Sequence, residues 1–278
     1  MSIKNYFQLM RFHKPIGILL LLWPTLWALW IAAEGTPQFK NIFIFTAGVI
    51  VMRAAGCVIN DIADRKLDKH ITRTKDRPLT AQKIKTHQAI YLFCLLCAIA
   101  FMLVLLTNLK TILISIIAVL IATIYPFMKR YTHFPQLALG IAFSCSIPMA
   151  FTAENQALSG TTWILFLANI LWTIAYDTEY AMLDREDDIK IGIKSTAILF
   201  GKYDRIIIGV LQGIFILLMG YIGLLEQFSI MYFVGLFLAI TLFFYQQRLM
   251  PKRCMDAFLN NQWVGLIVFI AVILSVSH

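Results

Sequence analysis

Two short segments of this chain concentrate acidic side chains at helical spacing. The first runs from Asn60 through Asp64 to Asp68, and the second from Asp184 to Asp188. Residues four apart share one face of an α-helix, so a helix that continued through each cluster would point its side-chain oxygens one way. Like charges at this spacing repel, which indicates a compensating cation. Carboxylates without companion histidine or cysteine suit Mg²⁺, which also takes oxygen ligands from substrate phosphates.

Basic residues accompany both clusters. Arg73 and Arg77 follow the first, Lys194 follows the second, and Lys129 with Arg130 lies in a third polar loop. Guanidinium and ammonium groups bind phosphate oxygens that a metal does not reach. A surface network of ion pairs would explain one such cluster. Two clusters with matching spacing, in the two longest loops, instead favour a site for Mg²⁺ and a diphosphate.

Membrane-spanning helices must position these residues. Of the 278 residues, 60% are hydrophobic and 14% charged, whereas about a quarter are charged in soluble proteins. A spanning helix needs about 20 mostly apolar residues. The chain, residues 1–278, is therefore predicted to be one all-α, polytopic membrane domain. Its nine expected spans are residues 16–33, 41–59, 89–107, 111–128, 136–153, 162–180, 206–225, 229–245 and 263–276.

The basic residues are distributed unevenly about these spans. Nearly all of them precede the first span or follow an even-numbered one, and only Lys40 and Lys110 lie in the opposite loops. Because cytoplasmic loops retain lysine and arginine, the N-terminus and both acidic loops are predicted to be cytoplasmic. The net charge of +9 is then explained by topology and by attraction to anionic lipid headgroups. No nucleic-acid partner is needed.

Two ionisable residues lie inside predicted spans. Arg53 precedes Asn60 by seven residues, and Asp177 precedes Asp184 by the same interval. Two helical turns, or about 10 Å, therefore separate each residue from its cluster on the same helix face. Charges within a span usually face a partner or a cavity. Arg53 and Asp177 are thus expected either to pair across the bundle or to face a substrate.

The two acidic motifs resemble the signatures of the UbiA superfamily of membrane prenyltransferases. These signatures are N-D-x-x-D-x-x-x-D followed by R-x-x-x-R-P, and D-x-x-x-D; both are complete here, at Asn60–Asp68, Arg73–Pro78 and Asp184–Asp188. Residues 53–61, 125–133 and 192–196 more narrowly resemble the bacterial branch that prenylates 4-hydroxybenzoate in ubiquinone synthesis. The resemblance covers essentially the whole chain.

This resemblance implies a bundle of about nine helices around a central lipid-open cavity, in the inner membrane of a bacterium. It implies Mg²⁺ as the metal, with a polyprenyl diphosphate as donor and 4-hydroxybenzoate as acceptor. No protein partner is implied. The expected metal ligands are the members of both acidic clusters, Asn60, Asp64, Asp68, Asp184 and Asp188.

Each remaining residue then has an expected role. Lys129 and Lys194, with the two arginines after the first cluster, should bind the substrate diphosphate while its negative charge grows. Arg53 or Arg130 should bind the carboxylate of the acceptor, and Asp177 should help to deprotonate the ring after attack. The alternative pairing of Arg53 with Asp177 stays open.

Two other functions compete with this one. A sibling prenyltransferase would use another acceptor, such as a naphthoate or haem. A secondary transporter is less favoured, because it should carry its charged or broken helices at mid-membrane. Here the acids gather at one surface instead.

Overall fold

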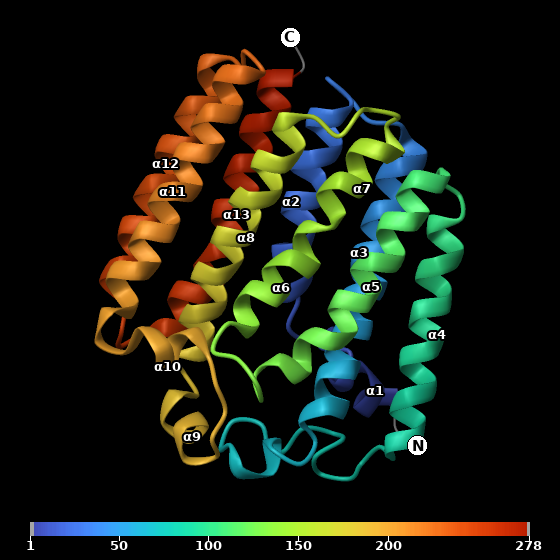
Figure 1. Cartoon of the computed structure of the whole chain (residues 1–278), viewed down its shortest axis with the longest axis vertical. Coiled ribbons are helices and arrows are strands. Elements are labelled where there is room, and N and C mark those ends of the chain that lie inside the picture. Colours follow the sequence, from blue (N-terminus) through green and yellow to red (C-terminus); the bar gives the residue numbers. More distant parts are fainter. Residues whose placement is uncertain (1–2, 277–278) are drawn as a thin grey trace.

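The computed structural model describes residues 3–276 as a bundle of α-helices, without a β-strand in that range. Figure 1 shows most of them running along one common direction, with short helices and loops gathered at one end. The helices are α1 (Ile3–Leu9), α2 (Ile16–Ala32), α3 (Phe39–Asp64), α4 (Thr86–Val104), α5 (Leu109–Met128), α6 (Pro135–Ser144), α7 (Ser146–Ala153), α8 (Gly160–Ala181), α9 (Arg185–Lys190), α10 (Thr196–Phe200), α11 (Asp204–Leu225), α12 (Ile230–Leu249) and α13 (Cys254–Val276), with 3-10 turns η1 (Asp68–His70) and η2 (Gly201–Tyr203).

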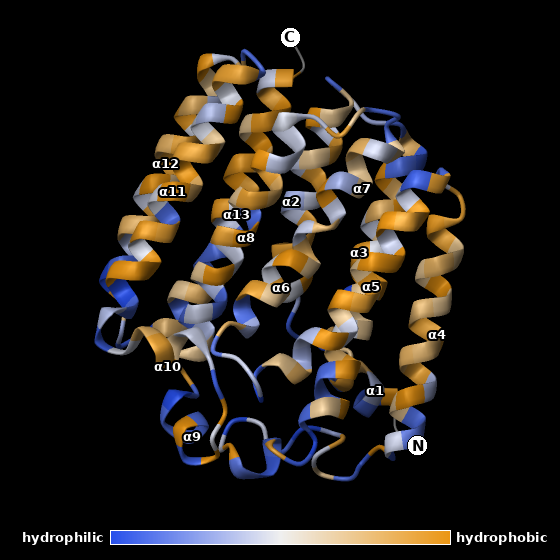
Figure 2. Ribbon diagram, in the orientation of Figure 1, coloured by the Kyte–Doolittle hydropathy of each residue, from blue (hydrophilic) through white to orange (hydrophobic). Residues whose placement is uncertain are grey.

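Each of the nine predicted spans falls on one long helix or, for residues 136–153, on the pair α6 and α7. Within the described residues, seven segments are long and apolar enough to cross a membrane: α3, α4, α5, α6 with α7, α10 with α11, α12 and α13. Helix α2 is apolar but has only 17 residues, and α8 has 22. Figure 2 shows hydrophobic helix middles and hydrophilic loops around α9. The chain is an integral membrane protein with several spanning helices.

One predicted span is not a single helix. Residues 136–153 form α6 and α7, which meet at Cys145. Pro148 has no backbone N–H to donate to the carbonyl of Ser144, so the regular hydrogen-bond ladder is interrupted here. The side chain of Ser146 instead donates to the Phe143 carbonyl at 3.0 Å.

A stack of aromatic rings fills the bundle between α2, α8 and α11. The ring centroids of Trp27 and Trp172 lie 5.3 Å apart, and those of Trp172 and Phe215 lie 5.7 Å apart. Both indoles also bind α13, because Trp27 donates to the Gly265 carbonyl at 3.0 Å and Trp172 to Asn261 at 2.9 Å. This aromatic stack is therefore tightly packed, and the open space of the bundle lies beside it, lined by α2 to α7 and by the polar ends of α8 and α13.

The predicted helical continuation through each acidic cluster is only partly correct. Asn60 and Asp64 share α3, and the Asp188 N–H donates to the Asp184 carbonyl at 2.8 Å at the start of α9, but neither spanning helix continues through its whole cluster. Helix α3 ends at Asp64, so Asp68 opens the separate turn η1, and α8 ends at Ala181, so Asp188 lies on the new helix α9. Carboxylates are unfavourable at the negative C-terminal end of a helix dipole and favourable at the N-terminal end. Beginning η1 and α9 beside the acids satisfies this preference.

Candidate active site

The ends of α3, α5 and α8, together with η1 and α9, enclose a small polar cavity of about 150 Å³. It brings together residues more than a hundred positions apart in the chain, as the sequence predicted. The cavity is lined by every expected metal ligand and by four of the expected diphosphate-binding residues: Asn60, Asp64, Asp68, Asp184, Asp188, Arg73, Arg77, Lys129 and Lys194.

Basic side chains already neutralise three of these carboxylates. Arg73 binds Asp184 through two nitrogens, with Nε at 2.9 Å from one carboxylate oxygen. This two-point geometry is the stronger form of an arginine–carboxylate pair. The other two pairs join Lys129 Nζ to Asp64 Oδ2 at 2.5 Å and Arg77 Nη1 to Asp68 Oδ2 at 2.8 Å.

The oxygen atoms of the site fit a magnesium ion chemically. Within residues 3–276, no group of three acidic, histidine or cysteine side chains is arranged to hold a metal, and three of the carboxylates pair with arginine or lysine. Even so, Asp64 Oδ1 is buried without a hydrogen-bond partner. Burial and the neighbouring charge of Asp184 raise the pKa of Asp188 to about 6. A divalent cation would give Asp64 Oδ1 a partner and would supply positive charge beside Asp188.

Asp61 is a site residue that helical spacing did not single out. Its carboxylate is fully buried and pairs with Arg11 Nη2 at 2.7 Å and Arg77 Nη1 at 3.2 Å. Burial acts to lower the pKa of Arg77, but Asp61 and Asp68 outweigh that effect and the pKa is raised. Asp61 thus fixes a guanidinium that also reaches Asp68. The signal in the sequence was its place as the second residue of the first motif.

A second, larger cavity of about 1140 Å³ adjoins the polar one. The two share lining residues from four segments, including Asn60, Tyr125 and Asp177, so they lie directly against each other. The larger cavity follows α3 from Asn60 to Ile44, sixteen residues or about 24 Å along the bundle. A charged pocket therefore adjoins a long, mainly apolar cavity.

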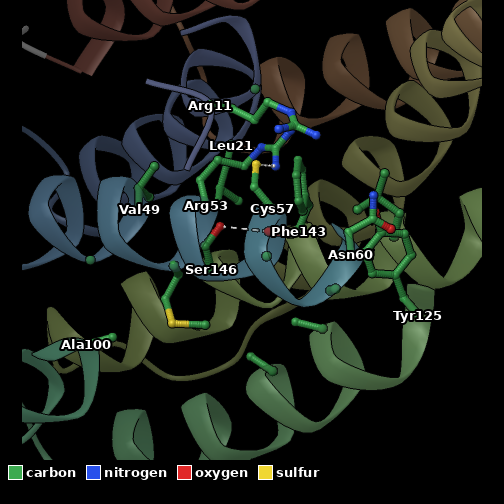
Figure 3. Close-up of a pocket in the computed structure, with 18 of the residues that line it drawn as sticks. Arg11, Leu21, Val49, Arg53, Cys57, Asn60, Ala100, Tyr125, Phe143 and Ser146 are labelled. Carbon is green, nitrogen blue, oxygen red and sulfur yellow. Dashed lines mark hydrogen bonds between the residues drawn. The ribbon is translucent and has the colours of Figure 1, made fainter. Parts of the chain in front are cut away.

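Arg53 lies in this larger cavity, two turns from Asn60 on α3, and Figure 3 shows its guanidinium beside Cys57. Its Nη1 donates to the Cys57 sulfur at 2.6 Å, whereas Nε is buried and has no hydrogen-bond partner. Asp177 lines both cavities, but no ion pair joins it to Arg53 in the described chain. The direct pairing suggested by the sequence is absent, and Arg53 keeps one buried donor without a partner.

Arg130 and Lys194 occupy different positions. Arg130 donates to the Ala63 carbonyl at 2.5 Å, stacks over the Phe127 ring at 5.4 Å and lines neither cavity. Lys194 lines the polar cavity and donates to the Tyr131 carbonyl at 3.1 Å. The arrangement places Arg130 against the end of α3 and leaves Lys194 beside the carboxylates.

A charged pocket at the mouth of an apolar cavity defines a membrane enzyme for substrates with a charged head and an apolar tail. The UbiA prenyltransferase family model matches residues 21–263, and the chain belongs to this family of prenyltransferases. Family membership and the site at one end of the bundle exclude the transporter alternative.

Known relatives extend the match over nearly the whole chain. A 4-hydroxybenzoate octaprenyltransferase of Coxiella burnetii strain CbuK_Q154 is 54% identical, covering 99% of this chain and 97% of its own. The enzyme of the same name from Pseudoalteromonas translucida is 56% identical, covering 98% and 95%. The apo structure of a UbiA homologue from Aeropyrum pernix K1 superposes with a TM-score of 0.82 at 23% identity, over 92% of this chain and 96% of that one.

Proposed function

We propose that this protein transfers a polyprenyl group from polyprenyl diphosphate to C3 of 4-hydroxybenzoate, in a magnesium-dependent step of ubiquinone synthesis. The observation that carries the proposal is the polar cavity lined by both aspartate clusters, which adjoins a long apolar cavity lined by Arg53. The names of the relatives favour 4-hydroxybenzoate over a naphthoate or haem as acceptor. The product is a 3-polyprenyl-4-hydroxybenzoate.

The carboxylates and amide of the polar cavity would hold Mg²⁺. Bound there, the metal acts as a Lewis acid that neutralises the diphosphate leaving group. A UbiA homologue from Archaeoglobus fulgidus, with a TM-score of 0.73 and 18% identity over 97% of this chain and 99% of that one, has been solved with GPP and Mg²⁺. The ligands proposed in this chain are Asn60, Asp64, Asp68, Asp184 and Asp188.

The basic side chains of the site bind the diphosphate. Arg73, Arg77 and Lys129 exchange their present carboxylate partners for phosphate oxygens when the donor and its cation arrive, and Lys194 adds a fourth positive charge. They stabilise the charge that develops on the leaving group as the allylic carbon–oxygen bond breaks. The aspartates therefore keep the cationic groups in place until the donor binds.

Arg53 holds the acceptor, because its guanidinium lies in the cavity about 10 Å along α3 from Asn60. With the acceptor carboxylate on Arg53, the ring lies between that residue and the diphosphate pocket. Ring carbon C3 then forms a bond to the allylic carbon, and the proton on C3 leaves to Asp177, which lines both cavities. Arg130 lines neither cavity, so we assign the acceptor carboxylate to Arg53 and a positioning role at the end of α3 to Arg130.

We also propose an orientation in the bacterial inner membrane, with the N-terminus and both acidic loops in the cytoplasm. The positive charge of those segments supports it. Water-soluble 4-hydroxybenzoate and Mg²⁺ then reach the site from the cytoplasm.

An assay of the purified protein in lipid vesicles tests the function. Octaprenyl diphosphate, 4-hydroxybenzoate and Mg²⁺ are expected to give the 3-octaprenyl product, measured by mass spectrometry. EDTA should abolish product formation, and excess Mg²⁺ should restore it. Turnover of a dihydroxynaphthoate or haem but not of 4-hydroxybenzoate would assign a sibling activity. Full turnover in EDTA would refute the metal requirement.

A glycine in α2 provides a sharper test of Arg53. A Cβ added to Gly17 would lie 2.4 Å from Arg53 Nε and Nη2, so Gly17→Ala must displace the guanidinium. Loss of one charge-assisted hydrogen bond to the acceptor should raise the KM for 4-hydroxybenzoate about tenfold. The KM for the prenyl donor should change little. Gly213→Ala in α11 is the matched control, because nothing lies within 4 Å of its added Cβ and it lines neither cavity; an equal effect of both variants would contradict the assignment.

A further inference from the structure

One polar side chain of the small cavity has no part in the steps above. Gln136 is the second residue of α6, lines the polar cavity and is only 4% exposed. A buried amide in a membrane protein finds its hydrogen-bond partners within the bundle, because hydrocarbon offers none. The partners of Gln136 therefore indicate what this side chain does.

The amide oxygen of Gln136 is already occupied. The backbone N–H of Thr196, the first residue of α10, donates to Gln136 Oε1 at 3.1 Å. Thr196 is itself held on α8, since its hydroxyl lies 2.7 Å from the hydroxyl of Thr178. A backbone N–H is accepted by the oxygen of an amide and not by its nitrogen, so this contact fixes which way the amide is turned. The NH₂ group of Gln136 is left to donate elsewhere.

Asp177 of α8 is the partner of that NH₂ group. Both residues line the polar cavity, and the side chain of Gln136 is hydrogen-bonded to the Asp177 carboxylate. Within residues 3–276, no lysine, arginine or histidine forms an ion pair with Asp177. An amide rather than a cation therefore holds this carboxylate.

A close approach of α6 to α8 brings the two side chains together (Figure 1). A Cβ added to Gly140 would lie 3.2 Å from the Ile170 carbonyl oxygen, which is tighter than an ordinary contact. Gly140 follows Gln136 by about one turn, and Ile170 precedes Asp177 by about two. Each pair shares one helix face, so the contact of Gly140 with Ile170 sets the distance between the faces that carry Gln136 and Asp177.

A fixed carboxylate suits the last step of the proposed reaction. Once ring carbon C3 has bonded to the allylic carbon, the C3–H bond breaks, its electrons restore the aromatic ring, and the proton passes to Asp177. A general base must have an oxygen within hydrogen-bond reach of the proton that it takes. A carboxylate that turned freely would meet this condition only part of the time.

We propose that Gln136 is a positioning residue, which holds the Asp177 carboxylate in the orientation that accepts the C3 proton. This inference rests on the proposed function. Gln136 acts through Asp177 and contacts neither reacting carbon. Its loss therefore slows proton removal and leaves the binding of the donor, the acceptor and Mg²⁺ unchanged.

Gln136→Met tests the proposal, because methionine has a similar length and no charge but cannot donate a hydrogen bond. Its kcat should fall about tenfold or more, since a small misplacement of a reacting group can cost about a hundredfold. The KM values for both substrates and the Mg²⁺ requirement should not change. With 4-hydroxybenzoate deuterated at both carbons beside the hydroxyl-bearing carbon, the isotope effect on kcat should be larger than in the wild-type protein, because breaking the C3–H bond now limits the rate.

Two further variants separate positioning from general stability. Thr196→Val removes the hydroxyl contact with Thr178 but keeps the N–H that Gln136 accepts, so its isotope effect should equal that of the wild-type protein. Asp177→Ala should lower kcat about a hundredfold or more. Adding Gln136→Met to Asp177→Ala should lower it no further, because a residue that acts only through Asp177 has no effect without it.

Several outcomes would overturn the inference: an unchanged kcat in Gln136→Met, a loss without a larger isotope effect, or a further loss in the double variant. A raised KM for octaprenyl diphosphate would also overturn it and assign the amide to the diphosphate. If Gln136→Met does not fold, Gly140→Ala tests the same contact, since it pushes α6 from α8 and should also enlarge the isotope effect. A wild-type protein that forms no 3-polyprenyl product refutes the proposed function itself.

Discussion

Asp64→Ala is expected to lower prenyl transfer by at least about a hundredfold, because loss even of groups that only support metal ligands costs ten- to a hundredfold. Asp64 lines the polar cavity, is 2% exposed and has one carboxylate oxygen free. Removing it takes a ligand from the proposed metal and leaves Lys129 without its partner. Asp184→Ala should have an effect of the same order, since Asp184 lines the same cavity from the other cluster.

The measurement is product formation in vesicles across a range of Mg²⁺ concentrations. Asp64→Asn keeps the shape of the side chain but loses its charge, so it should need more Mg²⁺ for half-maximal rate. Asp256→Ala is the control, because Asp256 pairs only with Arg253 on the surface, at 2.6 Å. Full activity of Asp64→Ala in correctly folded protein would remove the aspartate clusters from the mechanism.

The spans could be predicted from the sequence because the bilayer imposes a simple rule. About 20 apolar residues are needed to cross it, and runs of that length can be recognised whatever the packing of the helices. The break between α6 and α7 was missed, although Pro148 carries its cause. A proline near a helix end and one at mid-helix leave the same apolar pattern, so hydropathy alone does not separate them.

The residues that make up the site could be predicted from the sequence, but the backbone conformation of the acidic segments could not. Spacing of four grouped Asp64 with Asp68, and they do share a cavity, yet α3 ends at Asp64 and a turn leading into η1 places Asp68. Asp61 was missed for the same reason, since helical spacing assigned it to another face. Helix dipoles and partner charges beyond the local sequence decide where such an acidic segment stops being helical.

The partners of the two charged residues inside the predicted spans were the hardest feature to predict, because they depend on tertiary structure. Shared helix faces made Arg53 and Asp177 plausible partners, but pairing across a bundle requires the side chains to meet, which spacing cannot specify. In the structure both residues line the larger cavity without an ion pair between them, and Arg53 donates to Cys57 through Nη1. A buried arginine with an unsatisfied donor lowers the stability of the folded protein unless a ligand completes its hydrogen bonds.

This incomplete hydrogen bonding of Arg53 is the basis of the second prediction, a large loss of acceptor binding in Arg53→Ala. Arg53→Ala should raise the KM for 4-hydroxybenzoate by at least about thirtyfold, corresponding to the ~2 kcal/mol or more that follows truncation of one partner of a buried charge pair. The KM for the prenyl donor should change little, because all the diphosphate-binding residues line the polar cavity and Arg53 does not. Arg53→Lys should recover part of the loss, since it restores the charge without the two-point geometry.

A neutral acceptor makes this prediction specific. The wild-type protein should prefer 4-hydroxybenzoate strongly to 4-hydroxybenzamide, and Arg53→Ala should treat the two nearly alike, because only the carboxylate gains from the guanidinium. Arg130→Ala provides the comparison: its guanidinium binds the Ala63 carbonyl outside both cavities, so its loss should lower the rate with both acceptors equally. Arg130→Ala rather than Arg53→Ala could instead abolish the preference for 4-hydroxybenzoate over 4-hydroxybenzamide. The acceptor carboxylate would then bind near the end of α3, and the ring would have to enter from the loop side.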